Sequence, residues 1–158
     1  MKYFLCILFI VIGIKHVFAA EWIHDISGMV TKEELLINNK ISISTFKIVS
    51  QWTDNLRHYG SSICIGFIER HTDGEIKNLQ NSCERIDENG IKYWTRGERA
   101  KSQLKAGVGY SHIIDSTSPY RDELIGTKCT YAINYLNNLS FSKTKCELSD
   151  DLLRKLSN

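Results

Sequence analysis

The residues best suited to chemistry in this 158-residue chain are four cysteines, Cys64, Cys83, Cys129 and Cys146. Thiols can form disulfides, bind metals or act as nucleophiles. The chain has no C-x-x-C motif and no nearby pair of histidines, which argues against a zinc site. An even number of cysteines in an oxidising compartment indicates two disulfides. Three pairings are possible, and the short loops favour 64–83 and 129–146 because they cost little entropy to close.

Other catalytic patterns are absent from the sequence. His58, His71 and His112 are isolated and lack the spacing of metal ligands. The His24-Asp25 pair has neither flanking cysteines nor the glycine-rich calcium loop of a secreted phospholipase. No G-x-S-x-G motif, phosphate-binding loop or clearly partnered carboxylate pair is present. We therefore expect a protein without enzymatic activity, cofactor or metal; a small secreted hydrolase is the distant alternative.

The N-terminus has the pattern of a cleavable signal peptide. Lys2 supplies a positive charge, residues 4–14 are almost entirely apolar, and Val17-Phe18-Ala19 provides a small-residue cleavage pattern. The apolar run of about eleven residues is shorter than the roughly 20 that a membrane-spanning helix needs. Cleavage after Ala19 or Ala20 would also remove Cys6 and leave a secreted, extracellular domain.

The charge of the expected mature chain is balanced. Signal removal takes two of the 20 basic residues, which leaves 18 against 18 acidic residues. Basic and acidic side chains are interspersed, so a nucleic-acid partner is not expected. No later apolar stretch is long enough to span a membrane. The single proline and the lack of low-complexity sequence favour one ordered domain.

Apolar periodicity predicts two helices. Phe46, Val49 and Trp52 recur at three- and four-residue steps, which predicts a helix over 44–59. Ile76, Leu79, Cys83 and Ile86 share one helical face and predict the main helix, which ends at Asn89-Gly90. Short β-prone runs predict strands over 62–68, 91–95, 103–114, 128–135 and 139–146, and residues 149–156 suit a short helix. The expected fold class is therefore α+β, with an antiparallel sheet of four to five strands packed around one main helix and two disulfides.

The last third of the chain resembles the cystatins, secreted inhibitors of papain-like cysteine peptidases. Gln103-Leu104-Lys105-Ala106-Gly107 matches their Gln-x-Val-x-Gly hairpin, and Tyr110 follows as their aromatic residue does. Asn134-Tyr135 stands where that family has Pro-Trp, and Ser142 to Cys146 is similar to its C-terminal end. The resemblance implies a cystatin-like domain over 61–147 that blocks a peptidase cleft with two hairpins. The contacts would come from Gln103, Leu104, Lys105, Ala106, Gly107, Asn134, Tyr135 and Leu136.

Several departures from the family pattern leave an alternative function open. Lys105 replaces the central valine of the first hairpin, and a lysine at the wedge is costly to desolvate. Asn138-Leu139-Ser140 is the only N-glycosylation sequon of the mature chain, and a glycan on Asn138 would be bulky at the second hairpin. The alternative is a non-inhibitory secreted binding or effector module that takes another extracellular protein as partner.

The expected organisation has four parts. A signal peptide covers residues 1–19, and an N-terminal extension with the helix over 44–59 covers residues 20–60. The cystatin-like domain of residues 61–147 follows, and residues 148–158 form a C-terminal tail.

Overall fold

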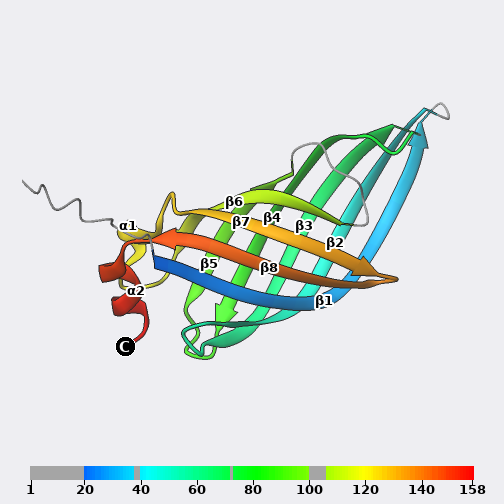
Figure 1. The fold of residues 1–158 in the computed structure, drawn as a ribbon. Helices are drawn as coiled ribbons and strands as arrows, with labels where there is room; N and C mark the ends of the chain where they lie inside the picture. The colour runs from blue at the N-terminus through cyan, green and yellow to red at the C-terminus, as the bar shows by residue number, and fades with distance from the viewer. Residues whose placement is uncertain (1–19, 38–39, 72, 100–105) are drawn as a thin grey trace, which may run out of the picture.

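The chain folds into a closed antiparallel β-barrel of eight strands (Figure 1). The structure is a computed structural model that describes residues 20–37, 40–71, 73–99 and 106–158. The strands are β1 (Ala20–Ile37), β2 (Ile41–Asp54), β3 (Tyr59–His71), β4 (Ile76–Asp87), β5 (Lys92–Glu98), β6 (Ala106–Ser116), β7 (Lys128–Leu136) and β8 (Leu139–Leu148).

Each strand pairs with the next along the chain, and the barrel closes where β1 pairs with β8. In this last pairing Trp22 lies opposite Cys146, and Met29 lies opposite Leu139. Beyond Met29, β1 pairs with β2 alone as far as Ile37. The ends of β1 to β4 therefore project past the turn between β7 and β8, as Figure 1 shows.

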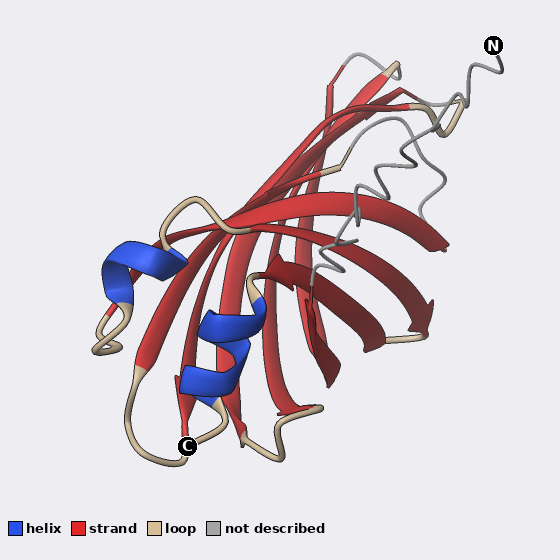
Figure 2. Cartoon of the chain, turned by 60° about the vertical axis from the view of Figure 1, so that its left-hand side comes forward, coloured by secondary structure: helices blue, strands red, loops and turns tan. Residues whose placement is uncertain are grey.

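Two short helices, α1 (Arg121–Leu124) and α2 (Asp150–Leu156), lie at the opposite end of the barrel (Figure 2). The Oγ atom of Ser149 accepts a hydrogen bond from the backbone N–H of Leu152 at 3.2 Å and caps α2. Leu124 and Leu152 are both buried. They join one apolar cluster with Trp22, Tyr93, Ile113, Cys129, Cys146 and Leu148.

A second apolar cluster lies toward the projecting ends of β1 to β4. Its buried members are Phe46, Ile48, Ile68, Ile76 and Leu79. The two clusters occupy different stretches of the strands, and the interior between them is lined mainly by small polar side chains.

The expected α+β fold is wrong. The predicted helix over 44–59 is mostly strand β2, and the predicted main helix is strand β4, so no main helix packs on a sheet. Along β2 the inward positions include Ser42, Ser44 and Ser50, while Ile43 and Val49 point outward. This polar inner face hides the alternation of a half-buried strand, and the remaining apolar residues imitate a helical stripe.

Other expectations from the sequence are confirmed. The five predicted strands correspond to β3, β5, β6, β7 and β8, although residues 103–105 lie outside the described part of the chain. The helix expected over 149–156 is α2. Disulfides join Cys64 to Cys83 and Cys129 to Cys146.

Residues 20–60, expected to form an extension, supply β1, β2 and the start of β3 to the barrel.

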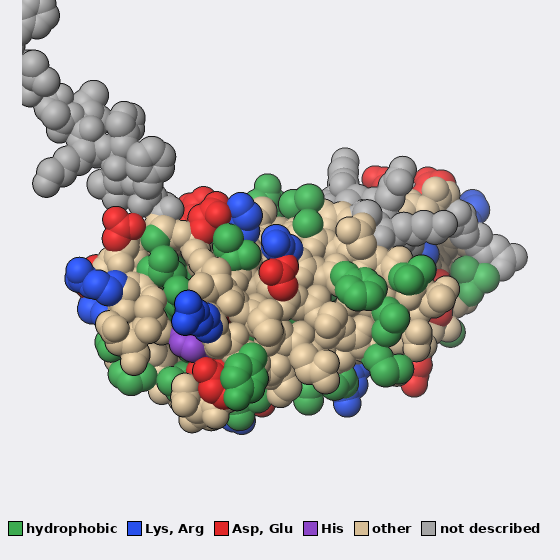
Figure 3. Space-filling model, turned by 60° about the horizontal axis from the view of Figure 1, so that its bottom comes forward, with side chains coloured by type: hydrophobic (Ala, Val, Ile, Leu, Met, Phe, Trp, Pro, Cys, Tyr) green, Lys and Arg blue, Asp and Glu red, His purple; other side chains and the backbone are tan. Residues whose placement is uncertain are grey.

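The outer face carries apolar side chains among charged ones (Figure 3). One row crosses five neighbouring strands by direct pairing, and every member is exposed. The row consists of Leu136, Leu139, Met29, Val49 and Ile63. Within the described residues, no helix has the length and apolar character needed to cross a membrane.

Candidate functional site: the barrel interior

A cavity of about 70 Å³ lies inside the barrel, between the two apolar clusters. Its lining is dominated by hydroxyl groups, from Ser50, Ser62, Thr95, Ser111, Ser140, Ser142, Thr144 and Tyr131. An eight-stranded barrel is just wide enough for side chains to fill it or for one small ligand to bind. Here the inward side chains are too small to fill the middle, so the barrel is hollow there.

Arg85 is the one basic residue in this lining. It lies on β4, directly opposite Ser62 on β3 and Tyr93 on β5. Its side chain keeps some accessible surface because it lines the cavity, but protein atoms enclose it deeply. This burial lowers the pKa of Arg85 to about 10, so the guanidinium is still charged at neutral pH.

The guanidinium of Arg85 has few partners. Its Nη1 atom lies 3.4 Å from Nδ1 of His24, and its buried Nε has no hydrogen-bond partner among the described residues. No ion pair links Arg85 to any carboxylate in that part of the chain. A buried charge is normally paired, because removing it from water is costly.

His24 lies between Arg85 and an aromatic floor, the rings of Trp22 and Trp52, which line a smaller void that also borders Arg85. Its ring lies 4.4 Å from the Trp22 ring and 5.4 Å from the Trp52 ring, centroid to centroid. Burial lowers the pKa of His24 well below its usual value, and the charges of Arg85 and His58 lower it further. The imidazole is therefore neutral at pH 7, and Nδ1 can accept the hydrogen bond from Arg85.

The carboxylates below this floor are already engaged. Asp54 accepts hydrogen bonds from the Trp22 indole N–H at 2.7 Å and from the backbone N–H groups of Leu56 and His58. Asp87 accepts bonds from the backbone N–H groups of Asn89 and Ile91, both at 2.9 Å. Both side chains stabilise loops, and neither forms an ion pair with Arg85.

A second buried arginine, Arg99, lies toward the other end of the barrel. A Cβ on Gly107 would overlap the Arg99 guanidinium, so the missing side chain makes room for it. Gly109 has the same relation to the ring of Tyr131. Burial raises the pKa of Tyr131 to about 12 and also raises that of Tyr135, while the Arg99 charge opposes both shifts. These phenols are therefore protonated at neutral pH.

Both disulfides also face the interior. Cys64 and Cys83 lie directly opposite each other on β3 and β4 and line the cavity. Cys129 and Cys146 are paired in the same way on β7 and β8, next to the aromatic floor. Each bond fixes the register of two neighbouring strands, Cys64–Cys83 beside the polar cavity and Cys129–Cys146 within the apolar cluster of Trp22.

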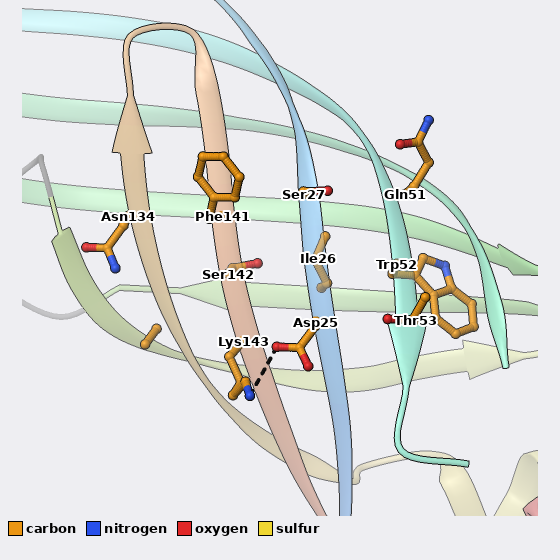
Figure 4. Close-up of a pocket in the computed structure, with 11 residues that line it drawn as sticks. Asp25, Ile26, Ser27, Gln51, Trp52, Thr53, Asn134, Phe141, Ser142 and Lys143 are labelled. Atoms are coloured by element: carbon orange, nitrogen blue, oxygen red, sulfur yellow. Dashed lines mark ion pairs between the residues drawn. The ribbon is translucent and has the colours of Figure 1, made fainter. Parts of the chain in front are cut away.

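A larger hollow of about 490 Å³ lies on the outside of the barrel wall across β7, β8, β1 and β2. In Figure 4, Phe141 and the Asp25–Lys143 ion pair stand on this surface. The ion pair measures 3.2 Å, and both side chains are more than half exposed. Exposed pairs of this kind contribute little to binding or stability. We therefore assign the candidate site to the enclosed interior.

The structure places the residues expected to bind a peptidase in two groups. Gln103, Leu104 and Lys105 lie outside the described residues, whereas Ala106 and Gly107 begin β6. Ala106 pairs with Asn134, so the two expected segments are neighbours at one end of the barrel.

Their side chains do not form one outward surface. Asn134 and Leu136 are exposed, while Tyr135 between them points into the barrel and is half-buried. The sequon asparagine, Asn138, is exposed in the two-residue turn that follows β7.

Arg85, His24 and the interior hydroxyls were missed by the reasoning from sequence. Arg85 sits in a segment interpreted as a helix, where an arginine is expected on the solvent face. For the interior hydroxyls, the available signal was the alternation of serine and threonine with other residues along β2 and β8. In the described part of the chain, His, Cys, Asp and Glu side chains form no group of three that could hold a metal ion.

Comparisons with protein-family models, with curated proteins and with solved structures find no match for this chain.

Proposed function

We propose that this protein is a secreted, non-catalytic binding protein that takes a small organic molecule into the interior of its barrel. The observation that carries the proposal is the cavity of about 70 Å³, lined by hydroxyl groups around a buried arginine. A packed core would have apolar side chains at these positions. Polar groups directed into a hollow are typical of a ligand site, where a few of them fix orientation.

Secretion is supported by two features. The N-terminal sequence has the pattern of a signal peptide, and the two disulfides suit an oxidising compartment. The Cys64–Cys83 disulfide also stiffens the hollow part of the barrel. A preorganised cavity loses less free energy to ordering when it binds a ligand.

The test uses the disulfide-intact chain without residues 1–19. Small neutral and charged organic molecules are screened by ligand-observed NMR. Trp22 and Trp52 fluorescence gives a second signal, because both rings line a smaller void that shares Arg85 with the cavity. Ser111→Met fills the cavity from β6, whereas Ser82→Met adds the same side chain at an exposed position of β4. Binding that Ser111→Met abolishes and Ser82→Met preserves would support the proposal. Equal binding by both variants would contradict it.

Peptidase inhibition stays a prediction, and one observation favours keeping it as a second candidate. Ala106 and Asn134 are paired, so the two segments expected to enter a peptidase cleft are adjacent. Titration of the protein against papain with a fluorogenic substrate tests this candidate. Nanomolar inhibition that Leu136→Asp removes would support it, and no inhibition at micromolar concentration would end it.

A further inference from the structure

This inference rests on the proposed function and concerns the chemical class of the ligand. Arg85 extends from β4 toward the cavity, and its only hydrogen-bonding neighbour among the described residues is Nδ1 of His24 at 3.4 Å. His24 is neutral and cannot balance the charge. The nearby carboxylates of Asp54 and Asp87 are held by loop N–H groups and the Trp22 indole. The guanidinium of Arg85 therefore has no ion-pair partner among the described residues.

We infer that the cavity binds a small organic monocarboxylate, with its carboxylate on the Arg85 guanidinium. A guanidinium presents a planar fork of N–H donors that matches the two oxygens of a carboxylate. Arg85 lines the cavity although its Nε is buried and has no partner among the described residues, so the Nη atoms are the donors that a carboxylate in the cavity would meet.

The number of charges favours a monoanion. One guanidinium balances one carboxylate. A phosphate dianion would bring a second negative charge into a cavity whose described lining has no basic residue besides Arg85. Hydroxyl groups of Ser62, Thr95 and Ser111 also line this cavity and can donate to a carboxylate oxygen.

The rest of the lining sets the character of the ligand tail. Ile26, Ile48 and Ile133 border the same cavity on other strands. When the carboxylate binds Arg85, a short aliphatic tail packed against these isoleucines would be removed from water. The volume of about 70 Å³ suits a short chain, so butyrate is the probe of choice.

The experiment compares butyrate with butyramide, which has almost the same shape but no charge. Titrations of the disulfide-intact protein are followed by the Nε–Hε signal of Arg85 in ¹H–¹⁵N spectra, assigned by its loss in Arg85→Met. Butyrate should shift this signal and bind at least ten-fold more tightly than butyramide. Arg85→Met should abolish butyrate binding, Arg85→Lys should retain part of it, and the exposed Arg96→Met should leave it unchanged.

The outcomes separate this inference from the proposed function. Equal affinity for the two probes, or butyrate binding that survives Arg85→Met, would overturn the carboxylate assignment but leave a ligand-binding barrel. If neutral molecules bind in the cavity and butyrate does not, the carboxylate assignment is likewise overturned and the ligand-binding barrel is kept. No binding of any molecule in the wider screen would overturn both. If Arg85→Met fails to fold, the Nε–Hε signal is assigned by its loss in Arg85→Lys, and its shift with butyrate together with the affinity of Arg85→Lys decides the question.

Discussion

Gly107 lies against the guanidinium of Arg99, so close that a Cβ on the glycine would overlap the Nη2 and Cζ atoms. The arginine is almost fully buried at 5% exposure and lines a hollow of about 280 Å³, so its head group would have to shift toward that hollow to admit a Cβ. Adding even one carbon to a filled interior forces side chains out of their preferred positions. The glycine is thus a packing requirement of the barrel.

Gly107→Ala should lower the free energy of unfolding by about 1–3 kcal/mol, the usual cost of overpacking. Urea unfolding followed by circular dichroism measures this change. Val108→Ala, at the next position of β6 and on the exposed outer face, is the matched control and should change stability by less than about 0.5 kcal/mol. Equal effects of the two variants would mean that Arg99 moves freely.

Replacing Arg85 by methionine should stabilise the protein when no ligand is bound. Methionine fills a similar volume without placing a charge in the interior, and such replacements of buried ionic groups have stabilised proteins by about 1–4 kcal/mol. Thermal unfolding of Arg85→Met and of Arg96→Met, on the exposed face of β5, measures the difference. A marked loss of stability in Arg85→Met alone would show that the guanidinium has a strong partner in the folded chain.

The neutral state of His24 predicts acid sensitivity. Its pKa in the folded chain lies well below the value of about 6.5 in the unfolded chain. As the pH falls below 6.5, the unfolded chain takes up a proton that the folded chain does not, so stability decreases. The loss should approach about 1.4 kcal/mol per pH unit until the folded pKa is reached.

Chemical unfolding between pH 7 and pH 5 tests this prediction. His24→Asn keeps a hydrogen-bond acceptor near Arg85 but cannot be protonated, so its stability should depend less on pH. His112→Asn, at an exposed position of β6, should retain the pH dependence of the parent chain. An unchanged slope in His24→Asn would assign the acid sensitivity to other groups.

The two disulfides should contribute similar amounts to stability. They close loops of nearly equal length, with separations of 19 and 17 residues. The chain-entropy estimate for such loops is about 3 kcal/mol each. Unfolding of the Cys64→Ser/Cys83→Ser and Cys129→Ser/Cys146→Ser double variants measures the two contributions separately. A difference of more than about 2 kcal/mol would mean that one bond acts on the folded barrel and not mainly on the unfolded chain.

The sequence predicted what depends on local pattern. Consecutive strands from β5 to β8 and the disulfide pairing follow from short-range signals. Barrel closure does not, because it depends on pairing between β1 and β8 at opposite ends of the chain. β2 was misread because serines face inward while Ile43 and Val49 face outward, and β4 because its inward residues include the polar Asn81 and Arg85.

The candidate site was unpredictable for the same reason. Arg85 becomes unusual only when β4 is recognised as a strand and its inward face is known. Sequence alone shows one arginine among 20 basic residues and a histidine 61 positions away. Their approach within the barrel depends on the register of strands that are distant in sequence.

Asn138 should carry a glycan when the protein is secreted from a eukaryotic host. Its side chain is exposed in the turn between β7 and β8, and it begins the sequon Asn138-Leu139-Ser140. Mass spectrometry before and after enzymatic deglycosylation should show a single modified asparagine, absent in Asn138→Gln. The glycan lies outside the barrel, so butyrate binding should be the same in both forms. It stands next to the exposed Leu136, so any papain inhibition should be weaker in the glycosylated form. Equal inhibition by the two forms would show that this turn does not enter the peptidase cleft.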